Sequence, residues 1–167
     1  MIIRLNETQR TPVLSIRERY TDVSLVYPSD LSLIVGFPQI GKTAFLTMLA
    51  GALLSPEPTE ANFDLFSPKH ETKNRIVFID TSNSYARSRR NYAEIKERAG
   101  EYFDEKNLTY VNYGNTELAD GIDFIKGDLF YSDNIKAILI DDIDALVNDV
   151  ESGGEANRLL STLHRHD

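Results

Sequence analysis

The sequence predicts an α/β fold in which a mostly parallel sheet carries helices on both faces. Short apolar runs that suit buried strands alternate along the chain with longer stretches of helical periodicity. Polar or glycine-containing segments follow several of these runs, as expected where parallel strands end at one edge of a sheet. Right-handed crossovers and a ligand site beyond the carboxyl ends of the strands follow from this pattern.

The individual elements are predicted from short apolar runs and from apolar residues spaced three or four positions apart. The predicted strands are residues 31–35, 75–80, 108–113 and 137–140. The predicted helices are 44–54, which is apolar almost all round, 85–103, the stripe over 118–129, and 155–164. The face of the 85–103 helix that we expect to be buried carries Tyr92, Ile95, Ala99 and Tyr102.

We expect one domain, preceded by a short lead-in. Residues 1–30 are interpreted as the lead-in and 31–167 as the core. Within the core, 55–74 holds three prolines and many polar residues, which predicts an exposed insertion. The last helix leads to no further strand, so the sequence also predicts that C-terminal strands of the usual fold are missing.

Composition excludes several classes of function. With 41% hydrophobic residues and no apolar run near the ~20 residues of a membrane span, we expect an intracellular protein that is cytoplasmic, or nuclear in a eukaryote. The absence of cysteine excludes thiolate chemistry, and none of the three histidines has the spacing of a metal site. A net charge of −8 argues against broad nonspecific nucleic-acid binding, although a local basic patch stays open.

A phosphate-binding motif lies between the first predicted strand and the first predicted helix. Residues 36–43 read GFPQIGKT, which matches the P-loop pattern G-x-x-x-x-G-K-[ST]. In such a loop the backbone N–H groups and the helix dipole hold phosphates, Lys42 reaches the β- and γ-phosphates, and Thr43 binds Mg²⁺. The alternative is a glycine-rich turn that only starts a helix. The residues expected to contact ATP are Gly36, Phe37, Pro38, Gln39, Ile40, Gly41, Lys42, Thr43 and Ala44.

Two adjacent carboxylates follow the last predicted strand. Asp141 is expected to order the Mg²⁺ shell together with Thr43, the alternative being a simple turn former. Lys42 and Asp142 are the two candidate catalytic residues. The alternative role of Asp142 is to cap the turn over 142–146.

These motifs lie within a longer pattern that resembles the RadA-type strand-exchange recombinases of the RecA superfamily. VFIDTSNSY at 77–85, followed by three arginines, is similar to their I-D-T-E-x-x-F segment, and 107–112 with the later ILIDDIDAL is similar to the stretch that leads to their Walker B strand. The resemblance covers about residues 31–165. It implies a RecA-like ATP-binding domain of a DNA recombination, repair or replication protein. It also implies assembly with RecA-like subunits, identical or different, and DNA as a further candidate partner.

The resemblance fails where the family carries the glutamate that polarises the attacking water, because this chain has Ser82 there. A serine without an activating partner is no general base, so we expect a Mg²⁺-dependent ATPase with slow turnover unless Asp142 takes that role. One alternative is a recombinase-paralog-like interaction module with little hydrolysis. Another is an AAA+-like ATPase, because DDIDAL also resembles the Walker B segment of that class.

The DNA-contacting loops of the family are poorly represented. The later loop would fall after Asp167, and the remnant of the first at 147–154 is acidic. The one tight basic cluster is Arg87, Arg89 and Arg90, which is either a solvated helix face interleaved with glutamates or a contact for DNA, a subunit or a nucleotide.

Overall fold

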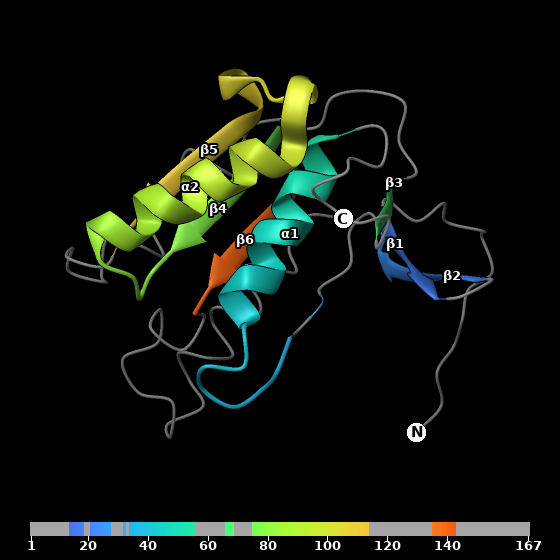
Figure 1. Cartoon of the computed structure of the whole chain (residues 1–167), viewed down its shortest axis with the longest axis horizontal. Helices are drawn as coiled ribbons and strands as arrows, with labels where there is room; N and C mark the ends of the chain where they lie inside the picture. Colours follow the sequence, from blue (N-terminus) through green and yellow to red (C-terminus); the bar gives the residue numbers. More distant parts are fainter. Residues whose placement is uncertain are drawn as a thin grey trace.

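The computed structural model describes residues 14–18, 21–27, 32, 34–55, 66–68, 75–113 and 135–142. In this part of the chain a parallel sheet and a smaller antiparallel sheet both pack against helix α1 (Lys42–Leu54) (Figure 1). The fold is therefore mixed α/β, as the alternation of strands and helices predicts. No described helix is long and apolar enough to cross a membrane.

The parallel sheet consists of β4 (Arg75–Asp80), β5 (Leu108–Asn112) and β6 (Ile135–Asp141) in the order β5-β4-β6. All three predicted strands are confirmed, and both pairings are parallel. The central strand β4 is buried from Ile76 to Asp80 on both faces, which explains its continuous apolar run. The register aligns Asp80 with Asn112 on one side and with Asp141 on the other, so three polar residues meet at the carboxyl edge of the sheet.

Helix α2 (Tyr85–Ala99) connects β4 to β5 and is amphipathic. Its buried face includes Ile95 and Ala99, as predicted, whereas Tyr92 is only partly buried. The prediction that this helix continues to 103 is wrong. Gly100, with φ 59°, ends the α-helix, and two short 3-10 turns, η2 (Gly100–Tyr102) and η3 (Glu105–Asn107), lead into β5.

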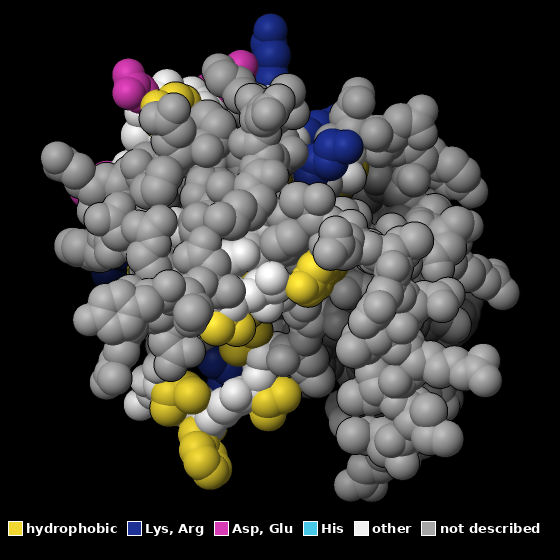
Figure 2. All heavy atoms as spheres, turned by 90° about the vertical axis from the view of Figure 1, so that its right-hand side faces the viewer, with side chains coloured by type: hydrophobic (Ala, Val, Ile, Leu, Met, Phe, Trp, Pro, Cys, Tyr) yellow, Lys and Arg dark blue, Asp and Glu magenta, His cyan; other side chains and the backbone are white. Residues whose placement is uncertain are grey.

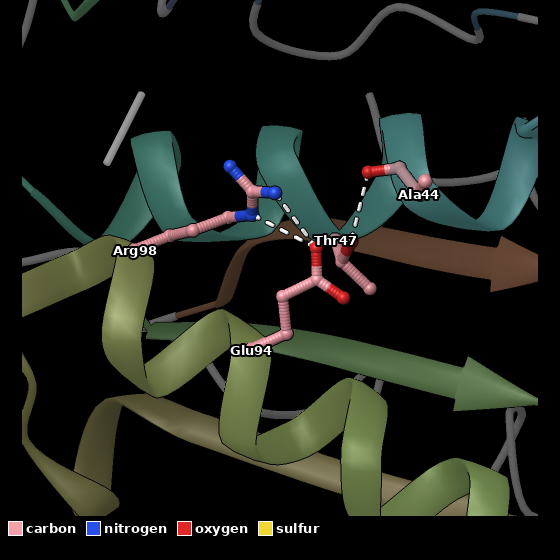
Figure 3. Close-up of polar contacts among 4 residues, drawn as sticks. All are labelled: Ala44, Thr47, Glu94 and Arg98. Carbon is pink, nitrogen blue, oxygen red and sulfur yellow. Dashed lines mark hydrogen bonds and ion pairs between the residues drawn. The ribbon is translucent and has the colours of Figure 1, made fainter. Parts of the chain in front are cut away.

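Helices α1 and α2 lie side by side on one face of the parallel sheet (Figure 1). Figure 3 shows one polar contact within each helix: in α2 Arg98 donates to the carboxylate of Glu94 at 2.7 Å, and in α1 the Thr47 hydroxyl donates to the carbonyl of Ala44 at 2.8 Å. An ion pair between residues four apart on a partly exposed helix stabilises it by only about 0.3–0.5 kcal/mol. Apolar burial from α1 must dominate, since its residues from Leu46 to Leu54 are almost all buried. The predicted helices over 118–129 and 155–164 lie outside the described residues. The prediction that helices also cover the opposite face of the parallel sheet therefore stays a prediction.

The close approach of the two helices depends on Gly51 of α1. A Cβ built at Gly51 would lie 2.5 Å from the Cβ of Arg98 on α2. An exposed helical glycine normally gains up to about 1 kcal/mol of stability on change to alanine. We expect the opposite sign here, with Gly51→Ala lowering the free energy of unfolding by about 1–3 kcal/mol because the helices must move apart. Urea unfolding measures this, and Ala93→Gly on the exposed side of α2 is the propensity control. A Gly51→Ala protein that is more stable than the wild type would contradict the close packing.

The antiparallel sheet was not predicted from the sequence. It contains β1 (Leu14–Glu18), β2 (Thr21–Val26) and β3 (Phe66–Pro68) in the order β2-β1-β3. The lead-in therefore contains a hairpin, and the predicted exposed insertion contributes a strand. Phe66 in that insertion is fully buried and meets Phe45 of α1 edge to face at 5.9 Å. A single aromatic residue in a proline-rich stretch thus anchors the small sheet to the core.

The predicted central strand over 31–35 is wrong in the part that is described. Ser32, Ile34 and Val35 are not in a strand, and Val35 is 81% exposed. The central position belongs to β4, and β6 pairs with β4. An apolar run becomes a buried strand only where another strand pairs with it, and among the described residues none pairs with this segment.

Candidate functional site

The loop that precedes α1 has a backbone that needs glycine. Gly41 lies in the left-handed region with φ 94° and directly precedes the helix. A Cβ at Gly36 would overlap the side chain of Ile40 across the loop. Gln39 also has a positive φ of 64°. The positive φ at Gly41 is therefore a conformation that favours glycine. At Gly36 an added Cβ would meet the end of the exposed Ile40 side chain, which can move aside.

Lys42 folds back across the loop. Its ammonium group donates to the carbonyl of Gly36 at 2.9 Å and to that of Phe37 at 3.2 Å. These bonds join the last part of the loop to its first residue, and the side chain is only partly exposed. The positive charge is thus held over the loop, where a phosphate group would need it.

The first turn of α1 presents unpaired backbone donors to the same loop. Phe45 donates to the carbonyl of Gly41 at 2.9 Å, so the three preceding N–H groups have no acceptor within the helix. No acidic residue lies in this turn, and no side chain in the described part of the chain caps it. An anion at this position would satisfy these donors and the helix dipole together.

Asp141 ends β6 and lies close to the P-loop helix. It is 4% exposed. Burial raises the pKa of its carboxyl group above the ordinary value, a hydrogen bond with the Thr43 side chain lowers it, and the charges of Asp142 and Asp80 raise it again. The structure thus brings together Thr43 and Asp141, the two residues that the sequence predicts as Mg²⁺ ligands.

Asp142 is only partly buried and has a positive φ of 44°. Aspartate tolerates this conformation better than most residues do. The Thr81 hydroxyl lies within hydrogen-bonding distance of two backbone carbonyls, at 2.9 Å from that of Asp141 and 2.7 Å from that of Asp142, and so anchors the end of β6 to the end of β4. The proposed capping role involves 143–146, which lie outside the described residues.

A buried polar cluster lies next to Asp141, around Asp80. The Asp80 carboxylate is fully buried and accepts hydrogen bonds from the backbone and side-chain nitrogens of Asn83, from the Ser88 hydroxyl at 2.7 Å and from the Tyr110 hydroxyl at 2.8 Å. Burial, together with the hydrogen bond and charge of Asp80, raises the pKa of Tyr110, which stays a neutral donor. Sequence analysis gave these residues no role. A strand-end Asp followed three positions later by Asn was the available signal.

The remaining candidates are solvent-facing or lie outside the described residues. Ser82 is exposed, and so are Arg87, Arg89 and Arg90 on α2, which leaves both interpretations of the basic cluster open. The three histidines and the acidic segment at 147–154 lie outside the described residues. Of the predicted nucleotide contacts, Gly36, Lys42 and Thr43 are partly buried, while those fully on the surface are Phe37, Pro38, Gln39, Ile40, Gly41 and Ala44.

Exposed apolar side chains lie in the 36–43 loop and directly before it. Phe37 is 84% exposed and Ile40 is 62% exposed, beside the similarly exposed Val35. The loop lies at the bottom of Figure 1, and hydrophobic side chains gather around a basic one at the bottom of the face in Figure 2. Phosphate binding through backbone N–H groups and Lys42 does not require these side chains.

The oxygen donors at this edge of the sheet fit Mg²⁺. The described residues contain no group of three or more acidic or histidine side chains that could hold a metal by themselves. Mg²⁺ in nucleotide sites needs fewer, because it binds one or two protein oxygens and takes the rest from phosphates and water. The Thr43 hydroxyl and the Asp141 carboxylate meet that requirement.

Comparisons with protein-family models, with curated proteins and with solved structures find no match for this chain.

The raised pKa of Asp141 predicts a stability cost for its charge. Because the folded-state pKa lies above the unfolded one, the favourable contribution is complete below the unfolded pKa and is lost as pH rises through the folded pKa. Near neutral pH we therefore expect Asp141→Asn to melt at a higher temperature than the wild type, without Mg²⁺ or nucleotide. The difference should shrink below about pH 4. Glu97→Gln, which neutralises a carboxylate at an exposed position, is the control. A lower melting temperature for Asp141→Asn than for the wild type at neutral pH would contradict a raised pKa for Asp141.

Proposed function

We propose that this chain binds ATP with Mg²⁺ through residues 36–44 and Asp141, and that it is a RecA-like ATPase domain of a DNA recombination, repair or replication protein. One observation carries the binding proposal. The loop that holds the Lys42 ammonium opens a helix that packs on β6, the strand whose last residue is the buried Asp141. A loop that merely starts a helix would need neither the folded lysine nor this meeting with a distant strand end.

Each residue has a distinct task in this proposal. The unpaired N–H groups of the first turn of α1 would hold the β-phosphate, and Lys42 would bridge the β- and γ-phosphates. Thr43 and Asp141 would hold the Mg²⁺ ion, which neutralises phosphate charge when bound. The RecA-like and DNA-related part of the proposal depends on the sequence resemblance around β4 and β6.

Titration calorimetry tests the binding proposal. ATP should bind one molecule per chain when Mg²⁺ is present, and chelation of Mg²⁺ should weaken that binding. Thr43→Ala removes the hydroxyl but keeps Lys42, so its ATP affinity should depend much less on Mg²⁺. Absence of ATP binding by the folded wild type would overturn the proposal.

A nucleotide-binding interaction module with little hydrolysis is the second candidate. It is favoured by Ser82, which is exposed at the position where the resemblance expects a catalytic glutamate. Fluorescence anisotropy of labelled single-stranded DNA separates the two candidates. A recombinase-type domain should bind that DNA more tightly with a nonhydrolysable ATP analogue than with ADP, whereas a module should bind ATP without this difference.

A further inference from the structure

Asn83 connects the buried Asp80 cluster to the carboxylate that is proposed to bind Mg²⁺. Its side-chain nitrogen donates to Asp80 Oδ1 at 2.8 Å and to Asp141 Oδ2 at 3.3 Å. It is 9% exposed and lies just after β4, whose Asp80 is in register with Asp141. One neutral amide therefore lies between two carboxylates from neighbouring parallel strands.

Asn83 is itself held by two further hydrogen bonds. Its backbone N–H donates to Asp80 at 3.0 Å, and its carbonyl accepts from the Asn112 side chain at 3.0 Å. The Asp80 carboxylate is in turn held by Ser88 and Tyr110. An amide fixed in this way has few ways to turn away from Asp141, so its position does not depend on Asp141.

The physical effect of this contact is specific. An Asp141 carboxylate without this partner would keep the freedom to rotate about its side-chain bonds. The Asn83 donor on Oδ2 fixes the plane of the carboxylate. A carboxylate of fixed orientation is what a Mg²⁺ site requires, and partners of metal ligands commonly set metal affinity.

We infer that Asn83 is a positioning residue that orients Asp141 for Mg²⁺ in the nucleotide complex. This inference rests on the proposed function, and it assigns Asn83 no contact with the nucleotide. The matched control is Tyr110→Phe, which removes a donor from Oδ2 of the same Asp80 carboxylate but leaves the bond between Asn83 and Asp141 in place.

The test measures how strongly Mg²⁺ improves binding of a nonhydrolysable ATP analogue, as the ratio of the dissociation constants without and with Mg²⁺. Asn83→Ala should lower this ratio by about tenfold, while affinity without Mg²⁺ stays near that of the wild type. Tyr110→Phe should keep the wild-type ratio. In an Asp141→Asn background, Asn83→Ala should cause no further loss, because Asn83 acts through Asp141.

A second measurement needs no Asn83 variant, which matters if Asn83→Ala does not fold. In the wild-type nucleotide complex the NMR signals of the Asn83 side-chain amide should shift when Mg²⁺ is added, and Asp141→Asn should abolish that shift. An unchanged Mg²⁺ ratio in folded Asn83→Ala, or an amide signal insensitive to Mg²⁺, would overturn the inference while leaving ATP binding intact. If the wild type binds no nucleotide, the proposed function falls and the inference falls with it.

Discussion

Steady-state phosphate release by this protein is expected to be slow, by roughly 10²–10⁴-fold relative to an ATPase with a positioned general base. The exposed Ser82 hydroxyl stands where the resemblance expects a glutamate, and a serine cannot accept a proton near neutral pH without a partner. Lys42 and Mg²⁺ can still stabilise developing charge, so residual turnover should depend on both.

Two variants locate the base, if one exists. Asp142 is a candidate because it follows Asp141 and is partly exposed, and asparagine tolerates its positive φ, so Asp142→Asn should preserve the backbone. If Asp142 is the base, Asp142→Asn should abolish turnover at unchanged ATP affinity, and Ser82→Glu should add little. If the chain has no base, Asp142→Asn should change almost nothing, whereas Ser82→Glu should raise the rate. Brisk wild-type turnover that survives Asp142→Asn would contradict both.

Lys42→Ala is expected to lose about tenfold to a hundredfold in ATP affinity, which corresponds to ~1.5–3 kcal/mol for a charge-assisted phosphate contact. The fold should survive, because among the described residues the lysine bonds only to carbonyls of its own loop, at Gly36 and Phe37. Titration calorimetry measures the affinity. Lys136→Ala, which removes an exposed lysine from β6, controls for net charge. Equal ATP affinity in Lys42→Ala and the wild type would contradict a phosphate role for this residue.

Sequence patterns predicted the elements whose burial is uniform. β4 is buried on both faces and α1 nearly all round, so an unbroken apolar run identified each of them. The apolar run at 31–35 resembles these two in sequence, yet Val35 is 81% exposed. Whether such a run becomes a buried strand depends on pairing with strands that are distant in sequence, which the run itself does not encode. Phe66 shows the converse, since a proline-rich context concealed a fully buried aromatic residue.

The candidate site also contains residues that a local motif predicts and contacts that depend on the tertiary fold. A local motif fixed Gly36, Gly41, Lys42 and Thr43, and their conformations fit that motif. We predicted the meeting of Thr43 with Asp141 from two parallel strands that end at one edge of a sheet. The described residues before the loop form no such strand, and it is the packing of α1 on β6 that brings the two residues together. The Asn83 contact with Asp141 spans 58 residues of sequence and depends on the register of two strands, which no local pattern encodes.

A crystal structure of the protein with Mg²⁺ and a nonhydrolysable ATP analogue tests the central claim most directly. The account predicts the phosphates against the backbone N–H groups of the 36–43 loop, Lys42 on the β- and γ-phosphates, and Mg²⁺ beside the Thr43 hydroxyl with Asp141 in its shell. A nucleotide bound elsewhere, or a loop without nucleotide at saturating analogue, would contradict it.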